Sequence, residues 1–148
     1  MYKKILVGVD ESQDAMNAVK KALELKKRDN SEVVVFHSVN HHYSEYSPNF
    51  SLTGASISFL IHEDYINIGK EILKKVEELF TNDGQIVETR LIIDVPPESY
   101  IKNITEEEDF DLIILGCNGK HSKLRRTFLG TIPNNVINNT SCDVLIVR

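Results

Sequence analysis

Five short apolar runs, separated by segments with helical spacing, constrain the fold of this chain most strongly. Residues 4–9 form the first run and show almost no polar alternation, which is typical of a central strand covered on both faces. The other expected strands are residues 32–39, 86–93, 111–115 and 144–147. The run at 86–93 alternates more than the others, which favours a sheet edge or a half-exposed strand.

Segments with apolar residues at helical spacing connect these runs. Residues 40 to about 62 lack any period and predict a loop of about twenty residues, which is long for a compact domain. The expected helices open at Asp10-Glu11-Ser12, extend from about Ile66 to Leu79, begin again at Pro96-Pro97-Glu98, and cover residues 132–139. This alternation predicts an α/β fold in one domain of residues 1–148, a doubly wound five-stranded parallel sheet with helices on both faces.

Length and composition narrow the class of protein. A chain of 148 residues suits one core, and 41% apolar with 26% charged residues is ordinary for a globular protein in water. No apolar run approaches the ~20 residues that span a bilayer, and the first residues lead directly into a strand rather than into a signal-peptide core. We therefore expect a cytoplasmic protein that does not enter the membrane. The net charge of −5 argues against non-specific nucleic-acid binding.

The cysteines and histidines indicate neither a disulfide framework nor a metal centre. Cys117 and Cys142 lie in or beside expected core strands, and we interpret both as reduced thiols. Cys117 beside a basic loop is interpreted as a small buried residue rather than as a reactive thiol. No frame of cysteines or acids joins the histidines at positions 37, 41, 42 and 62.

Glycines after the fourth expected strand suggest an anion site. Residues 111–115 lead into Gly116 and Gly119, and Gly130-Thr131 precedes the last helix-like segment. Glycines let a backbone approach a phosphate closely, and a helix start offers free N–H groups and a positive dipole end. Thr131 is expected to cap that helix, with Pro133 in its first turn.

Two more residues are expected at the same place in the fold. In doubly wound sheets the ligand lies outside the carboxyl ends of the strands, where the strand order reverses. Asp10 and Ser38 stand at the ends of the first and second expected strands, so they converge with the glycine loop. Asp10 is either a ligand contact or a plain helix cap. Four basic residues lie between Gly119 and Gly130, namely Lys120, Lys123, Arg125 and Arg126. They form either a solvated face or a surface for a small polyanion.

With these residues in view, the chain resembles the universal stress protein family along essentially its full length. The matching pieces are ILVGVDES (5–12), FHSV (36–39), DLIILG (111–116) and CDVLIVR (142–148). The family's ATP-binding pattern, Gly-x2-Gly-x9-Gly-[Ser/Thr], is similar to Gly116, Gly119, Gly130 and Thr131. Ten residues rather than nine separate Gly119 from Gly130. Asp94 is a second departure, because relatives usually carry a glycine after the third strand.

The resemblance implies an adenine nucleotide alpha hydrolase-like fold, with ATP and Mg²⁺ as ligands. It also implies a homodimeric stress-response regulator or adaptor with an unknown protein partner. The nucleotide-binding residues it implies are Val9, Asp10, Ser38, Val39, Leu115, Gly116, Gly119, Gly130, Thr131 and Ile132. Asp10 would approach the ribose hydroxyls or the Mg²⁺ ion. The implied pairing edge of the dimer is Val144, Leu145, Ile146 and Val147.

The extra residue before Gly130 leaves alternatives open. A bulge in the loop would preserve ATP binding, whereas a shifted helix start would leave a dimeric adaptor that binds no nucleotide. A slow ATP hydrolase or nucleotidyl-transfer enzyme is a further alternative. The sequence shows no Ser-His-Asp or Cys-His arrangement and no pair of carboxylates in the expected cleft, so we assign no catalytic residues.

Overall fold

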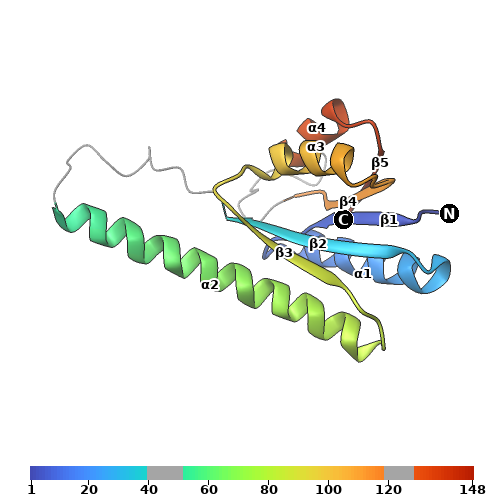
Figure 1. The fold of residues 1–148 in the computed structure, drawn as a ribbon, viewed down its shortest axis with the longest axis horizontal. Helices are drawn as coiled ribbons and strands as arrows, with labels where there is room; N and C mark the ends of the chain where they lie inside the picture. Colours follow the sequence, from blue (N-terminus) through green and yellow to red (C-terminus); the bar gives the residue numbers. More distant parts are fainter. Residues whose placement is uncertain (40–51, 119–128) are drawn as a thin grey trace.

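Strands and helices alternate along the whole chain (Figure 1). The computed structural model describes residues 1–39, 52–118 and 129–148, and for 52–61 it describes the backbone alone. The strands are β1 (Lys4–Gly8), β2 (Glu32–Val39), β3 (Glu88–Ile93), β4 (Leu112–Gly116) and β5 (Asp143–Val147). The helices are α1 (Gln13–Asp29), α2 (Leu52–Asn82), α3 (Pro97–Glu107) and α4 (Thr131–Asn139).

The strands form one parallel sheet in the order β3-β2-β1-β4-β5. The expected doubly wound α/β fold is therefore confirmed, with β1 at the centre and the more alternating β3 at an edge. The chain runs outward from β1 to β3 and then crosses back to β4. This reversal lies between β1 and β4, so their carboxyl ends form the switch point at which such sheets bind ligands.

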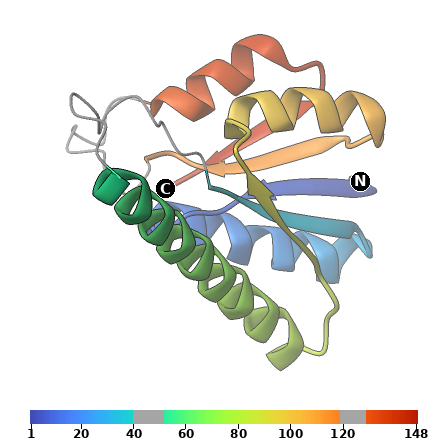
Figure 2. The same ribbon diagram turned by 60° about the vertical axis from the view of Figure 1, so that its left-hand side comes forward.

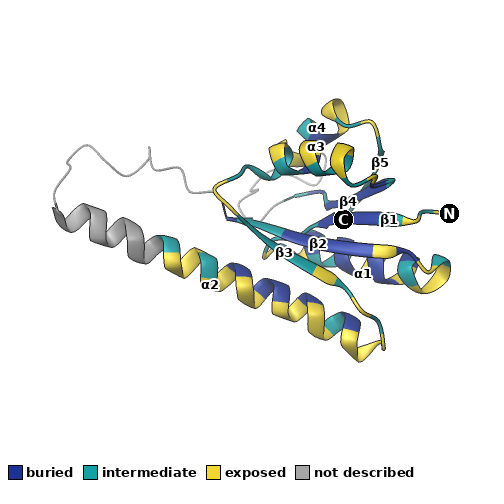
Figure 3. Ribbon diagram, viewed as in Figure 1, coloured by how far each residue is buried: buried dark blue, intermediate teal, exposed yellow. Residues whose placement is uncertain are grey.

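Helices cover both faces of the sheet, α1 and α2 on one and α3 and α4 on the other (Figure 2). The first core includes Val7 from the sheet, Val19 from α1 and Phe80 from α2, all fully buried. The second includes Phe36 from the sheet, Ile101 from α3 and Val136 from α4. Figure 3 shows the consequence, a central sheet buried between outer helical surfaces that are exposed. Burial on both faces explains the continuous apolar runs of the strands.

The expected long loop is wrong in its second half, because α2 already begins at Leu52. The sequence of residues 52–62 shows no apolar period and therefore predicts a loop. In Figure 1 this part of α2 extends past the sheet. A helix whose later turns are packed can grow by one hydrogen bond per added residue, and no proline interrupts this segment. The expected loop residues 40–51 lie outside the described residues.

The backbone conformation of Asp94 shows why glycine is favoured at the position after β3. Its φ of 59° lies in the left-handed region, which costs a side chain with a Cβ atom more than it costs glycine. The Asp94 N–H donates to the Val39 carbonyl at 2.9 Å. The turn therefore ties the end of β3 to the end of β2, beside the switch point.

Candidate functional site

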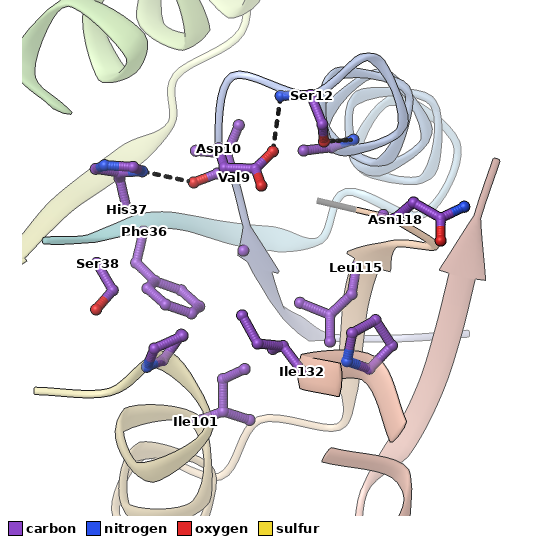
Figure 4. Close-up of a pocket in the computed structure, with 15 residues that line it drawn as sticks. Val9, Asp10, Ser12, Phe36, His37, Ser38, Ile101, Leu115, Asn118 and Ile132 are labelled. Carbon is purple, nitrogen blue, oxygen red and sulfur yellow. Dashed lines mark hydrogen bonds between the residues drawn. The ribbon is translucent and has the colours of Figure 1, made fainter. Parts of the chain in front are cut away.

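A cavity of about 230 Å³ opens at the switch point (Figure 4). Residues from the carboxyl ends of β1, β2 and β4, from the start of α1, and from α3 and α4 line it, and most of this lining is apolar. Six of the expected nucleotide-binding residues line the cavity, namely Val9, Asp10, Ser38, Leu115, Gly116 and Ile132. Residues far apart in the sequence thus converge here, as the placement at strand ends predicts.

The start of α1 determines what Asp10 does. Ser12 is the N-cap of α1, because its Oγ accepts a hydrogen bond from the Ala15 N–H at 3.1 Å. The Asp10 Oδ1 instead accepts from the Ser12 N–H at 2.8 Å. The alternative that Asp10 is a plain helix cap is therefore wrong. Its carboxylate is held at the cavity wall by a turn that precedes the helix (Figure 4).

Gly116 lets α1 approach the end of β4 closely. A Cβ atom at this position would lie 2.6 Å from the Ala15 nitrogen and 2.7 Å from the Asp14 carbonyl carbon. Both contacts are to backbone, which cannot move aside as a side chain does. The Asp14 carboxylate also accepts a hydrogen bond from the Asn118 N–H at 3.2 Å. Glycine is thus required here by packing, in addition to any approach of a ligand.

Hydrogen bonds fix the β2 side of the cavity. The Val9 N–H donates to the Phe36 carbonyl at 2.9 Å. His37 donates in return from Nδ1 to the Val9 carbonyl at 2.8 Å, since a carbonyl oxygen can only accept (Figure 4). The Ser38 hydroxyl donates to the Val95 carbonyl at 2.6 Å. These bonds tie the ends of β1 and β2 and the segment after β3 into one rigid rim.

Gly130, not Thr131, is the N-cap of α4. The prediction that Thr131 caps the helix is therefore wrong, since Gly130 is still extended and Thr131 is already helical. The Gly130 N–H donates to the Cys117 carbonyl at 2.9 Å, which places the helix start directly beside the end of β4. Among the described residues no side chain caps this first turn, and Pro133 lies in it as expected.

The remaining predicted residues lie outside the cavity wall or outside the described residues. Val39 is buried, and Gly130 and Thr131 lie at the start of α4 without lining the cavity. Gly119 and the basic residues 120–126 lie outside the described residues. Cys117 is fully buried, which confirms its interpretation as a core residue. Burial raises the pKa of the Cys142 thiol, and neither cysteine forms a disulfide.

Sequence reasoning missed several cavity residues, namely Phe36, His37, Pro97, Ile101, Asn118 and Pro133. Phe36 and His37 precede Ser38 at the same strand end, so the signal was present. Pro97 and Ile101 lie four residues apart and therefore share one face of α3. Which strand end that face covers depends on tertiary packing, which spacing alone does not give.

Two absences apply to the described part of the chain. No three His, Cys, Asp or Glu side chains there come together as a metal cluster, and His41 and His42 lie outside it. No described helix has the length and apolar character to cross a membrane.

Comparison with known proteins assigns the family. The sequence profile of the universal stress protein family matches residues 1–148. The chain belongs to this family. It is 32% identical over 148 residues to universal stress protein MJ0531 of Methanocaldococcus jannaschii, covering 100% of this chain and 83% of that protein.

Solved structures support the fold of this universal stress protein. UspA from Lactobacillus plantarum matches with a TM-score of 0.82 at 20% identity, covering 99% of this chain and 98% of that one. A universal stress protein from Archaeoglobus fulgidus, solved in complex with dAMP, matches with a TM-score of 0.66 at 21% identity. That comparison covers 99% of this chain and 98% of the other.

Proposed function

We propose that this universal stress protein binds ATP with Mg²⁺ at the switch point and acts as a dimeric stress-response regulator or adaptor in the cytoplasm. The apolar cavity between the ends of β1 and β4 supports this proposal most strongly. It combines a carboxylate at one wall with a helix start beside it. The dAMP complex of the relative from Archaeoglobus fulgidus supports an adenine nucleotide as the class of ligand.

The size of the cavity suits part of a nucleotide. Sites for drug-sized ligands are ~300–1,000 Å³, and this cavity of about 230 Å³ suits a base with its ribose. Ser38 would border the base, and Leu115 and Gly116 would line the path of the ribose. The phosphates would extend toward Gly130 and Thr131, where the first-turn N–H groups of α4 favour an anion.

Asp10 fits a Mg²⁺ ion that the nucleotide brings with it. Mg²⁺ keeps several waters and binds through one or two carboxylates together with substrate phosphates. In the described residues the cavity wall offers one such carboxylate, Asp10, and no cluster of three ligands. The ion would neutralise phosphate charge that otherwise repels Asp10.

The open edge of β5 fits the proposed dimer. In the described sheet β5 pairs only with β4, and Val144 to Val147 are half-buried. A second copy that pairs along this edge would cover them and satisfy their outward backbone groups.

Calorimetric titration of nucleotide-stripped protein with ATP and Mg²⁺ tests the proposal. We expect saturable micromolar binding, which would stabilise the fold by about 4 kcal/mol at millimolar ATP. Gly130→Asp places a carboxylate against the phosphates and should abolish binding while the fold survives. Gly84→Asp adds the same charge outside the cavity lining and serves as the control for ATP affinity alone, because its φ of 68° strains any side chain with a Cβ atom. Unchanged ATP affinity in Gly130→Asp would place the phosphates elsewhere.

Two alternatives give other results. A dimeric adaptor that binds no nucleotide would show no ATP-dependent thermal shift with its dimer intact. A slow ATP hydrolase or nucleotidyl-transfer enzyme would turn over ATP above background, and that turnover would be lost in Gly130→Asp.

A further inference from the structure

A second hollow lies beside the nucleotide cavity, between the start of α1 and the middle of α2. It measures about 730 Å³, and Asp10 and Ser12 line both hollows. The start of α1 is therefore a shared wall. On its far side the lining comes from Glu11, Gln13, Met16, Asp64, Asn67, Ile68, Glu71, Ile72 and Lys75. We call this hollow the α1–α2 groove.

The floor of the groove is apolar. Ile72 is buried and Met16 is half-buried, whereas Ile68 remains 39% exposed. Ile68 and Ile72 lie four residues apart on one face of α2, so they form a continuous stripe. Covering the exposed surface of Ile68 with an apolar side chain would therefore be favourable, because it removes apolar surface from water.

The rim of the groove is acidic. Four carboxylates line it, those of Asp10, Glu11, Asp64 and Glu71, and Lys75 is the one basic residue in the lining. Glu11, Asp64 and Glu71 are exposed to solvent. No three of the described acids are arranged to hold a metal ion, so a divalent cation does not explain the rim. The groove instead presents spread carboxylates above an apolar stripe.

We propose that the α1–α2 groove docks a lysine- or arginine-rich segment of a partner protein. Basic side chains place aliphatic stems on apolar surface while their charged ends reach carboxylates, which matches the stripe and the rim. A second copy of this chain, with its net charge of −5, is assigned to the β5 edge and not to this acidic rim. The same rim repels nucleic acid.

The shared wall couples this groove to the nucleotide site, a step that rests on the proposed function. Bound ATP adds negative charge next to Asp10 and should tighten the binding of a basic segment in the groove. Linkage requires that the segment tighten ATP by the same factor.

Fluorescence anisotropy with a labelled peptide of lysines and spaced leucines tests the docking without nucleotide. We expect Asp64→Lys combined with Glu71→Lys to weaken peptide binding at least tenfold. Glu106→Lys combined with Glu107→Lys makes the same charge change on exposed residues of α3 and should weaken it less than threefold. Equal losses in both pairs, or no binding to the unmodified protein, would overturn the docking site.

Ile68→Ser separates the apolar stripe from the charged rim. We expect a threefold or larger loss of peptide affinity with an unchanged melting temperature, since Ile68 is partly exposed. Unchanged affinity would overturn the apolar anchor. Repeating the titration with saturating ATP and Mg²⁺ should tighten the peptide at least threefold. Unchanged peptide affinity with ATP bound would overturn the coupling, whereas absence of ATP binding would overturn the proposed function and leave the docking result standing.

Discussion

The amino ends and the carboxyl ends of the strands are stabilised by different interactions. At the amino end, Glu108 accepts hydrogen bonds from Arg90 at 2.8 and 3.0 Å and from Lys4 at 3.1 Å. Asp111 accepts from the N–H groups of Lys3 and Lys4 at 2.7 and 3.1 Å. At the carboxyl end, backbone contacts and short polar bonds surround an apolar cavity.

We infer from this difference that the amino end contributes mainly to stability and the carboxyl end mainly to ligand binding. Arg90 and Glu108 form a bidentate pair, the strongest geometry for such a bond, and α3 is thereby fixed to the sheet far from the cavity. At the carboxyl end the described contacts include carboxylate bonds to backbone N–H groups and a close fit between backbones, as at Gly116. We therefore expect substitutions at the two ends to affect different measurements.

The largest effect is expected at Gly116. Gly116→Ala pushes a Cβ atom against the backbone of α1 and should destabilise the fold by about 2–3 kcal/mol. It should also weaken ATP at least tenfold, because α1 carries the Asp10 turn. Urea unfolding and calorimetry measure the two effects.

Gly8→Ala is the control for this substitution, since Gly8 lines the same cavity. Its added Cβ would meet the Leu115 Cδ2 at 2.8 Å and the Phe36 ring at 3.4 Å, both side-chain atoms that can shift. We expect a loss of about 1 kcal/mol. Equal losses in the two variants would show that contact with backbone is not what sets the cost at Gly116.

Glu108→Gln, at the amino end, should lower stability and leave ATP binding nearly unchanged. It removes the charge that Arg90 and Lys4 share, and we expect a loss of about 1–2 kcal/mol in urea unfolding. ATP affinity should stay within twofold of the original, because the pair lies at the other end of the sheet. Glu88→Gln removes only the exposed partner of Arg90 and should cost less than about 0.5 kcal/mol. Weaker ATP binding in Glu108→Gln would couple the two ends.

The loss of folding stability at acid pH should depend on the Glu108 carboxylate. Hydrogen bonds from Arg90 and then from Lys4 lower the pKa of Glu108 to about 2, below its ordinary value of about 4.3. A lowered folded-state pKa contributes stability that is complete above about pH 5 and is lost as the pH falls toward 2. Urea unfolding at intervals from pH 6 to 2.5 measures this slope. Glu108→Gln should flatten it, and an unchanged slope would assign the acid sensitivity to other carboxylates.

The sequence predicts the sheet and much of the cavity because both follow from burial along single strands. Asp10, Ser38 and Leu115 stand at the ends of apolar runs, and a parallel sheet gathers those ends at one place. The start of α2 was not predictable in this way, because residues 52–61 show no apolar period in the sequence. Pro97 and Ile101 escaped prediction because the packing of α3 over the cavity depends on contacts between distant segments.

The sequence does not determine which of several neighbouring residues caps a helix. Asp10, Ser12, Gly130 and Thr131 are all residue types that precede helices, and composition does not choose between neighbours. Backbone geometry chooses Ser12 and Gly130. The cap of α1 lies two residues after Asp10, so Asp10 lines the cavity and does not cap the helix.

The smallest expected effect compares one strained residue from each end of the sheet. Asp94 follows β3 at the carboxyl end and Asp109 precedes β4 at the amino end, with φ angles of 59° and 54°. Asp94→Gly and Asp109→Gly each relieve left-handed strain, partly offset by the flexibility of glycine when unfolded, so each should stabilise by about 0.5 kcal/mol in urea unfolding. Neither residue lines the cavity, and ATP affinity should stay within twofold in both. A loss of stability in Asp94→Gly alone would mean that the Asp94 carboxylate holds the turn beside the cavity, as the Asp10 carboxylate holds the turn before α1.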